Sequence, residues 1–241
     1  MTTQPGPTPH TSQGAVDALS PTWQRRLALS GVAFAFFLVV GWLTNPVADS
    51  PHYGASDQKW TNWSHNDQSK GHISSFAMLL AAFTFLYFIA AIRSALEGAE
   101  SSVRGSAYLA RVAFAGGVTG IVGMTMAFVS VANASAEGAS ANPVVSRAVT
   151  TGTAGPFLVG AVGFATLLLA VAVLTLRGGD FARWTGVVAL LGAVCFLITL
   201  LTVLNNTGNG STLGYAFFPA LLSLVIWTVA TSIARYRALP T

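Results

Sequence analysis

The sequence predicts an all-α protein that crosses a membrane six times, as a six-helix transmembrane bundle with one short interfacial helix outside it. Hydrophobic residues make up 53% of the 241 residues, charged residues only 8%, and the mean hydropathy is +0.61. A soluble domain carries about 25% charged residues, so this chain has too little charge to cover a water-facing surface. The composition excludes a soluble enzyme, a disordered chain and, because Cys195 is the single cysteine, a disulfide scaffold.

Six apolar runs are long enough to be membrane helices. A membrane helix needs about 20 mostly apolar residues, because the hydrocarbon core is about 30 Å thick and each residue rises about 1.5 Å. Runs of this length without Asp, Glu, Lys, Arg or His occupy 27–45, 73–92, 112–132, 152–176, 184–204 and 213–234. Barrel strands would alternate in polarity, and these runs do not. We expect a transmembrane domain over 27–234, between a disordered tail at 1–26 and a short tail at 235–241.

The basic residues predict the orientation. With the N-terminus inside, nine of the twelve basic residues lie on the cytoplasmic side, namely Arg25, Arg26, Arg93, Arg104, Arg111, Arg177, Arg183, Arg235 and Arg237. The outer segments 46–72, 133–151 and 205–212 hold the other three. Short loops rich in Lys and Arg stay in the cytoplasm, so we expect a multi-pass cell-membrane protein with both termini cytoplasmic. This bias accounts for the pI near 9.6. We therefore expect the lipid bilayer as a partner and no nucleic acid.

Ionisable side chains gather in the outer segment 46–72, which makes it the candidate place for a metal. The candidate ligands are three histidines and two carboxylates, since imidazole and carboxylate oxygen suit a transition metal: His52, His65, His72, Asp57 and Asp67. The spacing of the histidines matches no compact ligand motif. A metal site is therefore kept as the weaker reading of this segment.

A short helix is the stronger reading of the same segment. Ser56 can cap its start and Gly71 can end it before the second run begins. Trp60 and Trp63 then share one face of this helix. Paired tryptophans beside a membrane are typical of an interfacial helix, whose indoles lie at the headgroup level.

Glycines in the third run predict a packing surface. Gly116, Gly120 and Gly123 recur at helical spacing, and small residues let two helix backbones approach closely in lipid. We expect them to face a neighbouring helix of the same chain, with a homodimer contact as the alternative.

Pro156 and Pro219 lie near the starts of the fourth and sixth runs. Each proline lacks a backbone donor, so we expect both to kink their helices. Gly152 and Gly155 beside Pro156 leave open whether the fourth run begins as a re-entrant or unwound segment, as in many transporters.

The runs lack the residues of familiar intramembrane chemistry. No ionisable residue is present for ion-coupled transport, no facing histidines for haem, and no zinc-protease or Ser/His arrangement. We therefore expect no catalytic residue and no cofactor.

A resemblance to other membrane proteins covers about 60 residues of the chain and rests on three stretches of its sequence. The chain reads Trp60-Thr-Asn-Trp-Ser-His-Asn-Asp, then Phe83-Thr-Phe-Leu-Tyr-Phe-Ile-Ala-Ala-Ile-Arg, then Leu109-Ala-Arg-Val-Ala-Phe-Ala-Gly-Gly-Val. This order resembles a large family of uncharacterised bacterial integral membrane proteins with six helices. The resemblance implies packing and topology roles for Gly116, Gly117 and Arg93, and it implies no activity.

Three classes of function remain. The first is a non-enzymatic membrane subunit or scaffold that packs against other membrane proteins or a second copy of itself, and the lack of intramembrane charge favours it. The second is a passive or weakly coupled transporter or channel for a small neutral or apolar molecule. The two prolines and the hydroxyl side chains within the spans favour this class. The third is a metal-binding or enzymatic protein that works at the outer segment.

Overall fold

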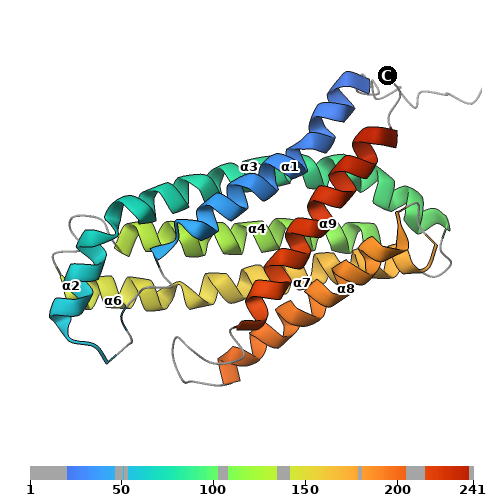
Figure 1. The fold of residues 1–241 in the computed structure, drawn as a ribbon. Helices are drawn as coiled ribbons and strands as arrows, with labels where there is room; N and C mark the ends of the chain where they lie inside the picture. The colour runs from blue at the N-terminus through green and yellow to red at the C-terminus, as the bar shows by residue number, and fades with distance from the viewer. Residues whose placement is uncertain are drawn as a thin grey trace, which may run out of the picture.

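The structure is a computed structural model that describes residues 21–46, 51, 54–102, 108–134, 142–178, 181–204 and 215–238. All regular structure in these ranges is helical (Figure 1). The α-helices are α1 Pro21–Leu43, α2 Asp57–Asn66, α3 Gln68–Ser102, α4 Leu109–Ala134, α6 Pro143–Gly152, α7 Ala154–Leu176, α8 Arg183–Leu200 and α9 Phe217–Ala238. A 3₁₀ turn, η2 Leu201–Leu204, follows α8.

Six segments are long and apolar enough to cross a membrane, which confirms the predicted number of spans. They are α1, α3, α4, the α6–α7 pair taken together, α8 and α9. The short helix α2 lies outside this set. The predicted fold class, an all-α six-span protein with one short helix before the second span, is therefore correct.

The second span is longer than its apolar run. α3 contains 35 residues, and a helix of that length spans about 52 Å, against a hydrocarbon core of about 30 Å. The apolar run stops at residue 92 because charged residues follow it. A charged residue marks the end of the apolar part of the span, but the helix itself can continue beyond it. Arg93 and Glu97 form an ion pair of 2.8 Å at i,i+4 spacing, a contact that favours continued helix.

The segment that leads into α7, which we predicted to lie outside, contains the helix α6. Asn142 caps it, because its side-chain oxygen accepts hydrogen bonds from Val144 N at 3.0 Å and Val145 N at 3.4 Å. Pro143 occupies the first helical position, where a missing N–H costs nothing. α6 and α7 then follow one another nearly end to end (Figure 1). Thr153 between them keeps helical dihedral angles, φ −64° and ψ −22°, so the fourth span does not begin as a re-entrant hairpin.

The two prolines lie at helix starts. Pro156 is the third residue of α7 and Pro219 the third residue of α9, positions at which an intrahelical donor is not required. A proline ring excludes the carbonyl of the residue four positions earlier, which for Pro156 is Gly152, the last residue of α6. At Pro156, where we predicted a kink near the start of the fourth run, the structure has a boundary between two consecutive helices.

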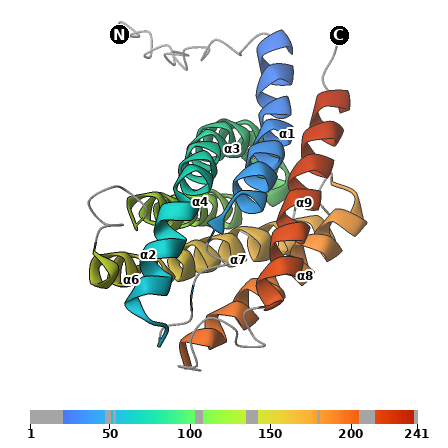
Figure 2. The same ribbon diagram turned by 60° about the vertical axis from the view of Figure 1, so that its left-hand side comes forward.

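The six spans form a closed ring. Each spanning helix packs on the next along the chain, α1 on α3, α3 on α4, α4 on α7, α7 on α8 and α8 on α9, and α9 returns to α1. Figures 1 and 2 show α1 and α9 side by side, with α2 and α6 together at the opposite end of the bundle from the start of α1 and the end of α9.

Aromatic side chains fill the interior of this ring. Phe85 of α3, Phe164 of α7 and Phe196 of α8 are fully buried, and successive ring centroids lie 5.8 Å apart. Phe217 of α9 continues the series at 6.0 Å from Phe196, and Trp42 of α1 stacks on Phe217 at 4.9 Å. These separations are those at which aromatic rings attract one another. The centre of the bundle is consequently a packed core.

Candidate functional site

Arg147 joins α2 to α6, and we call these two helices the outer cap because both lie in segments that we predicted to be outside. Its Nη2 donates to the carbonyl oxygen of Ala55 at 3.1 Å and to Oδ1 of Asp57 at 2.8 Å. The guanidinium carbon also lies 5.8 Å from the centroid of the Trp60 ring, within cation–π range. One α6 side chain therefore contacts the start of α2 in three ways.

Trp60 and Trp63 are buried in this cap. Their exposed fractions are 1% and 7%, and their rings meet edge to face at 5.7 Å. Trp63 Nε1 also donates to the carbonyl oxygen of Pro46 at 3.2 Å. The expectation that these indoles lie among lipid headgroups is wrong in this respect, because their burial leaves them almost no surface to offer lipid, with Arg147 of α6 over Trp60 and Pro46 bonded to Trp63.

Two other tryptophans have the exposure that an interfacial residue needs. Trp23 of α1 is 55% exposed and Trp184 of α8 is 54% exposed. Each lies close to arginine at the end of a span. Trp23 is near Arg25 and Arg26, and Trp184 directly follows Arg183. Tryptophan at the end of a span is typical of an aromatic belt, a signal that the sequence carried at both positions.

The candidate metal ligands do not come together. Asp57 is paired with Arg147, and Asp67 with Lys70 at 2.7 Å. His65 and His72 are exposed on α2 and α3, and His52 lies outside the described residues. Across the described ranges, no three His, Cys, Asp or Glu side chains are grouped so that they could hold a metal ion.

The glycines of α4 lie against α7. A Cβ built on Gly116 would be 2.7 Å from the backbone nitrogen of Leu167 and 2.8 Å from the carbonyl oxygen of Gly163. One built on Gly123 would contact the backbone nitrogen of Gly160. Gly160 and Gly163 of α7 are thus the partners of the α4 glycines, and we use the term glycine seam for these five residues: Gly116, Gly120, Gly123, Gly160 and Gly163. Only glycine permits backbones to approach this closely.

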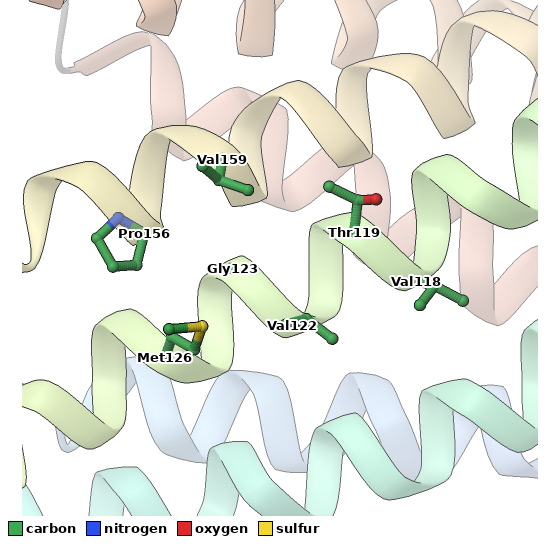
Figure 3. A pocket seen from close by; sticks show the side chains of 7 residues that line it. All are labelled: Val118, Thr119, Val122, Gly123, Met126, Pro156 and Val159. Carbon is green, nitrogen blue, oxygen red and sulfur yellow. The ribbon is translucent and has the colours of Figure 1, made fainter.

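A shallow hollow opens beside the glycine seam on the outer side of the bundle. Its volume is about 390 Å³, and Figure 3 shows side chains of α4 and α7 around it, with Pro156 and Val159 facing Gly123. The lining is apolar apart from the Thr119 hydroxyl: Val118, Thr119, Val122, Gly123, Met126, Pro156 and Val159. These groups suit an apolar chain, and they offer no acid, base or nucleophile.

Two neighbouring serines of α3 link three helices. Ser74 Oγ donates to the carbonyl oxygen of Gly41 in α1 at 2.7 Å, and Ser75 Oγ donates to that of Phe128 in α4 at 2.8 Å. Most other spanning hydroxyls bond to their own helix, as Thr84 does to Leu80 O at 2.9 Å. The cross-helix role of the Ser74–Ser75 pair cannot be read from the sequence, because a hydroxyl's partner depends on which helix lies beside it.

Three hydroxyls of α9 behave differently. Thr228, Thr231 and Ser232 are at most 1% exposed, and no hydrogen bond satisfies their hydroxyl oxygens in the described structure. They share one face of α9, since their spacing is that of i, i+3 and i+4. Ser232 Oγ lies directly on Gly31 of α1, so part of this polar face is packed against a helix backbone.

No protein-family model matches the chain, and neither characterised proteins nor solved structures show significant similarity to it. The structure and the residues themselves therefore carry the functional argument. They establish a polytopic membrane protein whose helices contact the lipid bilayer.

Proposed function

We propose that the protein is a non-enzymatic membrane subunit or scaffold whose helices pack against a membrane partner. The observation that carries this proposal is the aromatic core. Phe85, Phe164 and Phe196 close the centre of the six-helix ring, so the described conformation supports a rigid body rather than a conduit. The outer cap, in which Arg147 joins α2 to α6, adds a second rigid surface at one end of the bundle.

We also propose that the protein lies in the cell membrane with both termini in the cytoplasm. The nine-to-three division of basic residues supports this orientation. The start of α1 and the end of α9 lie at the same end of the bundle (Figure 2), as an even number of spans requires. The outer cap is then outside the cell, where it is accessible to extracellular partners.

Site-specific photo-crosslinking in native membranes tests the scaffold proposal. A photoreactive amino acid is placed at one exposed apolar position of each spanning helix, at Phe36, Phe83, Val122, Val162, Leu191 and Leu222. A scaffold gives an adduct of constant mass from one position or from two adjacent helices, and none from the buried control Phe88. Adducts with lipid alone at all six positions would contradict a membrane partner.

A passive transporter for a small neutral molecule is the second candidate, and the unsatisfied hydroxyls of Thr228, Thr231 and Ser232 favour it. Purified protein in liposomes distinguishes the two. The scaffold proposal expects urea and glycerol to leave these liposomes no faster than protein-free ones. Faster release that Thr228→Val or Ser232→Ala changes would support the transporter instead.

A further inference from the structure

The ends of α1 and α9 bring four arginines together without any carboxylate on either helix. Arg25 and Arg26 lie in the first two turns of α1, and Arg235 and Arg237 in the last turn of α9. Figure 2 shows these two helix ends side by side. The guanidinium carbon of Arg25 lies 5.4 Å from the centroid of the Tyr236 ring, a contact that joins α1 to α9. Neither helix contains Asp or Glu.

Within the described ranges, no ion pair compensates the charges of Arg26, Arg235 and Arg237. Cations at the end of α9 are favoured by the negative pole of its helix dipole, but Arg25 and Arg26 face the positive pole of α1. The ion pairs among the described residues join Asp67 to Lys70, Glu97 to Arg93 and Asp57 to Arg147. Arg26, Arg235 and Arg237 take part in none of them. Like charges at neighbouring helix ends repel, so an external anion would stabilise this end of the bundle.

Aromatic side chains place these guanidinium groups at a definite depth. Trp23 is 55% exposed and Tyr236 is 38% exposed, and the Arg26 guanidinium carbon lies 5.3 Å from the Trp23 ring centroid. Exposed Trp and Tyr at the ends of spans lie at the headgroup level of a bilayer. The neighbouring arginines therefore lie where lipid phosphates are found.

We propose that the ends of α1 and α9 form a binding site for the phosphate of an anionic phospholipid headgroup. A guanidinium group donates two parallel hydrogen bonds to a phosphate, and arginine suits this role better than lysine. Arg26 and Arg237 are exposed and contact the phosphate, while the Arg25–Tyr236 contact holds the two helices in register. This site is independent of the membrane partner proposed above.

Thermal unfolding of the full chain in a neutral detergent tests the proposal. Phosphatidylglycerol is titrated against the apparent melting temperature, with phosphatidylcholine and inorganic phosphate as separate arms. We expect phosphatidylglycerol alone to raise the melting temperature, because a ligand that binds only the folded state stabilises it. An equal rise with inorganic phosphate would identify a soluble-anion site, and an equal rise with phosphatidylcholine a general lipid effect; either result overturns the proposal.

Paired substitutions locate the site. Each basic residue near an anionic surface contributes about 1 kcal/mol, so Arg26→Gln with Arg237→Gln should raise the half-maximal phosphatidylglycerol concentration about 30-fold, since 1.4 kcal/mol is a factor of ten. The matched control, Arg177→Gln with Arg183→Gln, removes two exposed arginines between α7 and α8. It should raise the half-maximal concentration by less, because it loses the general attraction to an anionic surface but no contact with the bound phosphate. Arg26→Lys with Arg237→Lys keeps the charge and should give an intermediate value. Equal weakening by the control pair would refute a site at α1 and α9.

Discussion

Gly163 of α7 lies directly against the backbone of Gly120 of α4. A Cβ built on Gly163 would contact the amide nitrogen of Gly120 and would lie 2.5 Å from its Cα and 2.7 Å from the carbonyl oxygen of Gly116. All three atoms belong to helix backbone, which cannot rotate away as a side chain can. The contact between α4 and α7 therefore depends on the absence of a single methyl group.

Gly163→Ala should destabilise the protein by about 1–3 kcal/mol, the usual cost of overpacking a well-packed interface. The apparent melting temperature in detergent measures the loss. Gly155→Ala is the matched control on the same helix, since a Cβ there meets nothing within 4 Å. Equal melting temperatures for the two variants would show that α4 and α7 are not in close contact.

Phe164→Ala should cost about 3–5 kcal/mol, because it leaves a cavity where a fully buried ring contacts Phe85 and Phe196. Phe83→Ala, at a ring that is 59% exposed, should change stability far less. Both variants are compared by thermal unfolding. A Phe164→Ala protein as stable as Phe83→Ala would indicate that the aromatic core is not continuous.

Arg147→Met should loosen the outer cap, because it removes the hydrogen bonds to Ala55 and Asp57 and the cation over Trp60. Amide hydrogen exchange over 57–66 is expected to accelerate, while exchange in α7 stays unchanged. Asp57→Asn should have a smaller effect, since that side chain is 63% exposed and the other two Arg147 contacts remain. Lys70→Met removes the ion pair with Asp67, in which the Lys70 side chain is 57% exposed, and is the control, because ion pairs of exposed side chains contribute about 0–1 kcal/mol.

Cysteine labelling on intact cells tests the orientation. In a Cys195→Ala background, Lys59→Cys in α2, Ser101→Cys at the end of α3 and Ala238→Cys at the end of α9 all present exposed positions. An impermeant maleimide should label the first variant alone, and the other two only after the membrane is opened. The reverse pattern would mean that the termini lie outside, and different behaviour of the last two would contradict an even number of spans.

The six spans could be predicted because hydropathy is a local property that a single helix must satisfy by itself. The helix α6 was missed for a different reason. Asn142 followed by Pro143 is a recognisable helix start, but a search for apolar runs of membrane length passes over a helix of ten residues. The continuation of α3 past Arg93 was missed in the same way, since polarity and helicity are separate properties.

The burial of Trp60 could not be predicted from its neighbours in the chain. It is covered through Arg147, which lies far along the sequence and contacts Asp57 across 90 positions. Without that cover, two tryptophans beside a membrane are correctly read as interfacial. The α4 glycines were recognised as a packing surface, whereas their partners Gly160 and Gly163 were not, because many pairings of six helices are compatible with one small-residue pattern.

The glycine seam also has a consequence for how the chain is made. It joins the first three spanning helices to the last three, and among the described helices no other pair is in more extensive contact. Helices enter the bilayer in the order of synthesis and associate afterwards, so the α4 glycines must face acyl chains until α7 arrives. A nascent chain whose synthesis stops after α4 and before α7 would expose the α4 glycines to membrane insertases and proteases. Conversely, two polypeptides divided within 135–141 would each carry one side of the seam, and we expect them to associate through it.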